Sequence, residues 1–513
     1  MATADHVELV ARHGGHHYDN IKYGYVLFAL SIIYLVFRQS ALIYYHKAWI
    51  RSGRSTTNLG LVNTPMVYTV SIMSGIILIL EFFNLNIEEY GVHLKRFGRL
   101  AYALTPLDLV LAVRPSPFQL DNYLDTLTLH KWVSRIILAL GILHSMGYLV
   151  KWLAEDTLEK SLRLLNFYGV IIFVLFDVLL SVSWRKVRSI NYTWFIGFHN
   201  VVLFAYVVLI QLHARPGVTL LFLINMAILA YQYVVRLIST KSFTTEAVLK
   251  APDSNLEIVQ VPRRLLPAQF LPGCHMRISR YSLFNPLFWL LPSHPYTVAS
   301  VQENTGAFAK LVVKETRFKI EPFEKYWVQP YFRSSLSLEF FQTAENVTIV
   351  CGGSGISFGT PIFSHLLRKQ QVENKDIKLS CIWITPNVGD LFVLKELEIT
   401  GIKIYVTRSA TNQEVIEDPV SDEFELQTLE DDFQIQDEET GVPELDAESA
   451  QTTNTVHYGR RPDLGRLFVQ NVNRTIDYAN KWIVSCGPPS LNEECKRLAD
   501  SYKCRYFGEN YAM

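Results

Sequence analysis

Four histidines stand in two apolar stretches with the same spacing. His130 and His144 are 14 residues apart in one stretch, and His199 and His213 are 14 residues apart in the other. In an α-helix a step of 14 residues falls about 40° short of four full turns and covers about 21 Å. Both members of a pair therefore share one helix face. Ionisable side chains are costly inside a bilayer and usually serve a function there.

One further apolar stretch separates these two, so the helices that carry the histidines should run in the same direction. His130 is then level with His199, and His144 with His213. Neutral imidazole is a ligand for haem iron, and one ring from each helix can hold the iron from both faces. The spacing therefore predicts two stacked bis-histidine haem sites, one near each membrane surface. Packing or hydrogen bonding is the alternative role of any single membrane histidine.

Other side chains near these histidines allow two interpretations. Phe204 and Tyr206 either pack in the core or lie between the two macrocycles. Arg114, Lys131 and Arg135 either pair with haem propionates or extend to the membrane interface.

Such histidines need a frame of membrane helices. Stretches of about 20 apolar residues span a bilayer core, and the chain has seven candidates before residue 240. Arg99, Pro106 and Asp108 interrupt the third of them. The first 20 residues lack the layout of a cleavable signal peptide, which predicts that the first span is an uncleaved anchor. The candidates are 21–42, 65–84, 98–114, 129–151, 164–184, 192–213 and 217–238.

The composition of the 513 residues excludes several classes of protein. Lys+Arg number 48 against 48 Asp+Glu, and hydrophobic residues make up 49% of the chain. This excludes a disordered chain, a small disulfide-stapled domain and a basic nucleic-acid binder. All six cysteines follow residue 240, which predicts reduced thiols in a cytosolic domain.

The second half of the chain has the sequence of a soluble α/β protein. Residues 255–340 contain short apolar runs with Pro and Gly, as in a small β-barrel. Within them lies the segment from His294 to Ser300, HPYTVAS, in which an aromatic residue precedes hydroxyl residues. An extended segment of this kind can stack on a flavin and hydrogen-bond it.

A strand, a glycine-rich turn and a helix follow. The apolar run Val347–Cys351 leads into Gly352-Gly353-Ser354-Gly355 and then a helical stretch at 361–370. This arrangement can hold a pyrophosphate on backbone N–H groups at a helix N-terminus, and a tight strand–helix connection is the alternative. A later strand ends in Cys486-Gly487-Pro488, at the edge where parallel sheets bind ligands.

An acidic segment interrupts this half. No Lys or Arg lies between Arg408 and Arg460, and about fifteen Asp and Glu fall within 414–448. This composition predicts a solvated, low-complexity insertion, with a regulatory tail as the alternative.

Together these motifs resemble the ferric reductase / NADPH oxidase superfamily, and within it the fungal probable-metalloreductase subfamily. The four histidines, HPYTVAS, CGGSGI, CGPPS and the terminal Glu509-Asn510-Tyr511 occur in the family's order from about residue 98 to the end. The resemblance implies a multi-pass α-helical membrane domain of about seven spans with bis-His di-haem sites. A cytosolic ferredoxin-reductase-like module would follow, with a β-barrel FAD domain and an α/β NADPH domain.

The resemblance also assigns roles to residues of the second half. Cys486 and Tyr511 would be catalytic, on the nicotinamide side and as the aromatic that shields the flavin. The cofactor-binding residues would be His294, Pro295, Tyr296, Thr297 and Ser300 for FAD, and Gly352, Gly353, Ser354, Gly355, Arg460, Arg461, Cys486, Gly487 and Pro488 for NADPH.

Three positions depart from the family's pattern. Thr385 replaces an Arg that contacts the NADPH 2′-phosphate, and Gln329 replaces the first Gly of a Gly-Pro-Tyr-Gly turn. Tyr148 stands where animal oxidases carry a further His near the outer haem ligand.

The implied function is transmembrane electron transfer from cytosolic NADPH through FAD and two haem b groups to ferric or cupric chelates. A superoxide-generating NADPH oxidase that uses molecular oxygen, or a non-catalytic haem membrane protein, is the alternative. The chain would be a multi-pass protein of the plasma membrane or endoplasmic reticulum, with no nucleic acid and with protein partners unknown. The expected domains are a polar tail at 1–20, two transmembrane helices at 21–97, the di-haem core at 98–240, the FAD domain at 241–340, and the NADPH domain at 341–513 with its insertion at 411–455.

Overall fold

The computed structural model of the chain divides into two compact units. The first comprises Met1–Phe243, Met276–Pro295 and Lys325–Ser335, and the second comprises Thr244–His275, Tyr296–Glu324 and Leu336–Met513. The residues that the structure describes are 20–44, 66–86, 88–114, 123–268, 270–282, 293–299, 308–315, 318–334, 336–373, 377–408, 454–459, 461–471 and 480–510.

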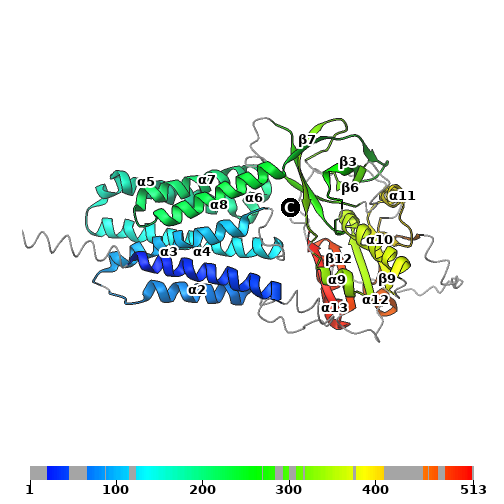
Figure 1. Ribbon diagram of the computed structural model, residues 1–513, viewed down its shortest axis with the longest axis horizontal. Coiled ribbons are helices and arrows are strands. Elements are labelled where there is room, and N and C mark those ends of the chain that lie inside the picture. Colours follow the sequence, from blue (N-terminus) through cyan, green and yellow to red (C-terminus); the bar gives the residue numbers. More distant parts are fainter. Residues whose placement is uncertain are drawn as a thin grey trace, which may run out of the picture. The chain divides into compact units, whose positions relative to one another are not determined.

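Long helices lie lengthwise beside one another in the first unit (Figure 1). In the described residues five of them are long and apolar enough to cross a membrane, and much of their apolar surface is exposed. Helix α2 (Met66–Phe82) is apolar but shorter, and α3 (Tyr90–Ala112) is more polar. The prediction of a multi-pass helical half is confirmed, while the number of spans stays a prediction. The five helices are Asn20–Tyr44, α4 (Tyr123–Ala154), α5 (Leu164–Ser183), α7 (Tyr192–Ala214) and α8 (Thr219–Ser239).

Helix α3 is the most enclosed of these helices despite its polar residues. It packs against α4 and α8, and every residue from Leu100 to Leu107 is buried. Because it faces other helices, it can carry Arg99, Pro106 and Asp108, which would be costly against lipid. The weak hydropathy of this stretch thus reflects its central place in the unit.

Two β-sheets precede the nucleotide-type domain. One has the strand order β1-β7-β4-β5, and the other has the order β2-β3-β6 with antiparallel pairs. A bridge between Val298 and Leu311 connects the end of β5 to β6. The strands are β1 (Lys241–Thr244), β2 (Val248–Lys250), β3 (Leu256–Pro262), β4 (His275–Arg280), β5 (His294–Thr297), β6 (Phe308–Lys314) and β7 (Lys325–Phe332).

A parallel sheet of order β11-β10-β9-β8-β12-β13 forms the last domain. The chain builds it outward from β8 in one direction and then returns to the other side of β8. The direction therefore changes between β8 and β12, which is where open α/β sheets bind their ligands. The strands are β8 (Asn346–Gly352), β9 (Lys378–Thr385), β10 (Lys403–Val406), β11 (Thr455–Tyr458), β12 (Lys481–Gly487) and β13 (Arg505–Asn510).

Helices cover both faces of this sheet, because side chains alternate along each strand. Cys351 and Trp383 face one apolar layer with α10, whereas Val350 and Ile382 face the other. The predicted α/β nucleotide domain is thereby confirmed. The first layer contains α9 (Leu338–Thr343), α10 (Ile356–Glu373) and α11 (Phe392–Leu397), and the second contains α12 (Leu464–Asn471) and α13 (Pro489–Ser501).

Candidate functional site

The four membrane histidines meet in two pairs, each between α4 and α7. The ring centroids of His130 and His199 are 6.4 Å apart, and those of His144 and His213 are 6.2 Å apart. The first pair lies toward the end of the bundle from which α8 leads into β1.

These distances suit an iron ion held between two imidazoles. With a metal–nitrogen bond of about 2 Å on each side and roughly 1.2 Å from ring centre to nitrogen, the centroids would be about 6.4 Å apart. Two bulky groups would also need room, and two glycines stand against the second pair. A Cβ on Gly98 would come within 3.1 Å of the His144 ring, and one on Gly169 within 2.9 Å of the His213 ring.

In His144 and His213, a hydrogen bond at Nδ1 leaves the Nε2 nitrogen of each ring free for a metal. Nδ1 of His144 lies 2.6 Å from the carbonyl oxygen of Leu94, and Nδ1 of His213 lies 2.7 Å from that of Leu165. A carbonyl only accepts, so Nδ1 carries the hydrogen and Nε2 keeps its lone pair. This is the usual arrangement of histidines that ligate metals.

The first pair has a different environment. Nδ1 of His130 lies 2.8 Å from Oδ1 of Asp108 and 3.2 Å from the backbone oxygen of the same residue. Nδ1 of His199 has no hydrogen-bond partner among the described residues. The sequence marked Asp108 only as an interruption of a span, although an ionisable residue inside a bilayer is itself a functional signal.

Tyr206 lies midway between His199 and His213 on α7, and its side chain is buried. Its ring centroid is 5.0 Å from that of Phe176 and 5.7 Å from that of Tyr102. Phe204, the other aromatic considered, is 37% exposed. Of the two, only Tyr206 is placed inside the bundle between the histidine pairs.

The basic residues near the first pair are placed differently from one another. Arg135 stacks on the ring of Trp132 at 4.7 Å, and both it and Lys131 are exposed. Arg114 is partly buried just after the end of α3.

The glycine-rich turn after β8 lies against the turn after β12. A Cβ on Gly352 would come within 2.9 Å of Pro488, and one on Gly487 within 3.2 Å of the backbone of Gly352. Gly353 has φ +51° and open space around its Cβ position, and the ring N–H of Trp383 donates to its carbonyl oxygen at 2.9 Å. Helix α10 begins at Ile356, directly after Gly355. The turn therefore offers backbone N–H groups and a helix N-terminus to an anion, which fits a pyrophosphate.

The end of β12 is fixed by side chains that no sequence motif indicated. Asn492 donates to the carbonyl oxygens of Gly487 and Glu509 at 3.3 and 3.1 Å, and Ser485 donates to its side-chain oxygen at 2.8 Å. Cys486 is 1% exposed and packs in the apolar layer with α10. In the parallel sheet, Cys486 is level with Cys351 on β8 and with Glu509 on β13.

The predicted coenzyme contacts are spread over several elements. Arg461 is exposed, and its guanidinium lies 3.2 Å from the carboxylate of Glu494 on α13. Thr385 is buried, and its hydroxyl donates to Asp390, which also accepts from Ser254 at 2.7 Å.

Three predicted site residues, Ser300, Arg460 and Tyr511, lie outside the described residues, as does almost all of the acidic insertion.

The predicted flavin segment forms β5, the edge strand of its sheet. Pro295 is exposed there, as expected for a residue that cannot donate to a neighbouring strand. Burial, and then the charge of Arg277, lowers the pKa of His294 to about 4, so this ring is neutral. On β7 of the same sheet, Gln329 is buried and its Nε2 has no partner among the described residues. An unsatisfied donor and an open strand edge are compatible with a flavin.

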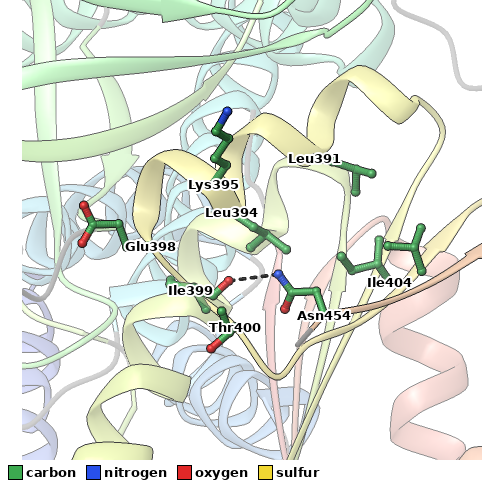
Figure 2. Close-up of a pocket in the computed structure, with 9 residues that line it drawn as sticks. Leu391, Leu394, Lys395, Glu398, Ile399, Thr400, Ile404 and Asn454 are labelled. Atoms are coloured by element: carbon green, nitrogen blue, oxygen red, sulfur yellow. Dashed lines mark hydrogen bonds between the residues drawn. The ribbon is translucent and has the colours of Figure 1, made fainter. Parts of the chain in front are cut away.

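A cavity of about 390 Å³ lies beside the end of α11. Figure 2 shows the residues that line it. Apolar side chains such as Leu394 and Ile404 line it, and Asn454 donates to the carbonyl oxygen of Ile399 at its wall, 3.0 Å away. It lies by the start of β10 and just before β11. This is the amino end of the sheet, opposite the edge that binds ligands in such folds.

Family models match three successive segments of the chain. They are a ferric reductase like transmembrane component at residues 97–210, an FAD-binding domain at 241–334 and a ferric reductase NAD binding domain at 344–500.

Curated relatives match over nearly the whole length. The probable metalloreductase AIM14 of Scheffersomyces stipitis is 36% identical, covering 98% of this chain and 98% of the relative. The protein of the same name from Candida tropicalis is 32% identical, covering 100% of both chains. Among solved structures, a ferredoxin-NADP+ reductase from Plasmodium falciparum matches with a TM-score of 0.32 and 10% identity, covering 53% of this chain and 96% of that chain.

Proposed function

The chain belongs to the family of fungal probable metalloreductases, and we propose that it is a transmembrane NADPH-dependent metalloreductase. Electrons from NADPH would pass through FAD and two haems to ferric or cupric chelates across the membrane. The observation that carries the proposal is the presence of two imidazole pairs, each spaced for an iron ion, on the same two helices.

The proposed cofactors divide the chemistry between them: a flavin accepts a hydride and releases single electrons, and a haem carries one electron at a time. The chain supplies the binding groups. His130 and His199 would hold the inner haem, and His144 and His213 the outer one. Because two histidines would hold each haem, an acceptor would react without binding the iron.

The soluble residues would bind and orient the coenzyme. Backbone N–H groups of Gly353 to Gly355 would hold the pyrophosphate at the N-terminus of α10. The Gly487-Pro488 turn would lie along the nicotinamide, kept in place by Asn492. NADPH belongs to the cytosol, so the second half of the chain would face the cytosol from either the plasma membrane or the endoplasmic reticulum.

The test is NADPH-driven reduction of a ferric chelate in sealed membranes without oxygen. Iron reduction under these conditions is the expected result. If the haems become reduced while the iron stays ferric until air is admitted, superoxide is the carrier, and the chain is an oxidase. If haem is bound, FAD is added and NADPH still reduces no haem, the chain is not an enzyme of this class.

A further inference from the structure

The two histidine pairs differ in what their ring N–H groups meet. In the pair of His144 and His213, both Nδ1 groups donate to backbone carbonyls, which are neutral. In the other pair, Nδ1 of His130 contacts the carboxylate of Asp108 at 2.8 Å. The two pairs are therefore electrostatically unequal, although their ring spacings are nearly the same.

The carboxylate of Asp108 is held firmly in this position. Ser134, one turn after His130 on α4, donates to both of its oxygens, at 3.0 and 2.8 Å. The side chains of Asp108 and His130 are only 15% and 16% exposed. Charge interactions are stronger in such a poorly solvated place than at the surface.

We propose that Asp108 is a positioning residue that lowers the reduction potential of the haem between His130 and His199 below that of the other haem. This inference rests on the proposed function, because it requires that both pairs bind haem iron. A carboxylate on the ring N–H makes the imidazole a more basic ligand, and such outer hydrogen bonds tune haem potentials. Reduction, Fe³⁺ + e⁻ → Fe²⁺, removes one positive charge, so a nearby negative charge favours the ferric form.

Other charges act on the same rings. Arg99 interacts electrostatically with His144 and His213, and its positive charge favours the ferrous form at that pair. Arg114 acts on His130 in the sense opposite to Asp108, but Asp108 is the group in contact with the ring. An electron that enters at the first pair is then released downhill to the second, toward the acceptor side.

The test is a spectroelectrochemical titration of both haems in the purified full-length protein, without NADPH. In Asp108→Asn the hydrogen bond remains and the charge is lost. The midpoint potential of the haem between His130 and His199 should therefore rise, while that of the other haem should not change. The rise should correspond to at least a tenfold change in the one-electron equilibrium constant, about 59 mV. In Ser134→Ala the carboxylate loses its competing donor and acts more strongly on His130, so the same midpoint should fall.

A loss of packing would move the midpoint potential of this haem in the same direction in both variants. Opposite shifts in the two variants therefore indicate an effect of the Asp108 charge. Unchanged midpoints in Asp108→Asn, or shifts of the same sign, would overturn the inference. Should Asp108→Asn bind less than two haems, Ser134→Ala decides alone: a lower midpoint supports the inference, and an unchanged or higher one overturns it. Absence of haem from the wild-type protein would contradict the proposed function itself, which is a distinguishable failure.

Discussion

The carbonyl oxygen of Cys486 occupies the place where Gly355 would carry a side chain. Gly355→Ala must therefore push the turn after β8 away from β12, at a cost of about 1–3 kcal/mol. Since this turn is the proposed pyrophosphate site, we expect the KM for NADPH to rise at least tenfold while both haems stay bound. Steady-state flavin reduction measures the effect.

Gly465→Ala is the matched control in the same domain. Its new methyl group would meet only the carboxylate of Asp463, at 3.2 Å, within a helix that favours Ala over Gly. It should leave the KM unchanged. An equal rise in the KM for NADPH in both variants would show that the effect of Gly355→Ala is not specific to the turn.

The histidine pairs predict the haem content of single variants. His144→Ala or His213→Ala should bind one haem where the wild type binds two, because only the haem of this pair would lose one of its two histidines. Reduction of the acceptor should be abolished, while NADPH still reduces the flavin. Pyridine-haemochrome assays and flavin absorbance measure both quantities.

His93→Ala provides the comparison, since His93 is a buried histidine of α3 whose hydrogen bonds among the described residues go to backbone groups of Glu81 and Asn86. Both haems should remain. Full acceptor reduction by His144→Ala or His213→Ala would refute the outer-haem assignment.

Coenzyme preference should depend on Arg461. A charge-assisted hydrogen bond to phosphate contributes roughly 1.5–3 kcal/mol, and the exposure of this guanidinium favours the lower end. Arg461→Ala should therefore raise the KM for NADPH about tenfold and that for NADH little. Glu494→Gln, which releases Arg461 from its ion pair, should leave the NADPH preference intact or increase it. An equal change for both coenzymes in Arg461→Ala would exclude a 2′-phosphate contact.

The burial of His294 predicts a pH dependence of stability. Its pKa is about 4 in the folded protein, mainly through burial, against about 6.5 when unfolded. The unfolded chain thus binds a proton that the folded one does not, so stability is full above pH 6.5 and falls as the pH drops toward 4. This histidine contributes a slope of at most about 1.4 kcal/mol per pH unit. Thermal unfolding of His294→Asn should show a shallower decline in this window, and an identical decline would contradict the prediction.

Much of the fold could be predicted from the periodicity and hydropathy of the sequence. Apolar stretches located the long helices, and strand–turn–helix patterns located the parallel sheet. The even spacing of His130/His144 and His199/His213 was enough to predict which rings become neighbours. These features are local, or follow from helix geometry alone, so they can be read from a single chain.

Contacts that depend on how one element packs on another could not be predicted. The pairing of Asp108 with His130 needs the register of α3 on α4, and the bond from Trp383 to Gly353 needs the register of β9 on β8. Thr385 was recognised as a departure, but its partner Asp390 is set by the turn after β9. The roles assigned to the site residues stay predictions.

The charged residues of α3, which flank its apolar middle, have a consequence for biogenesis. A segment with Arg96, Arg99 and Asp108 gains little by entering lipid alone, so the translocon would retain it until neighbouring helices are present. The same segment supplies the Leu94 carbonyl and the Asp108 carboxylate, one for each histidine pair. If both pairs hold haem, neither site would be complete until α3 is in place, and a chain that stalls before this step would expose an unassembled polar helix to membrane quality control.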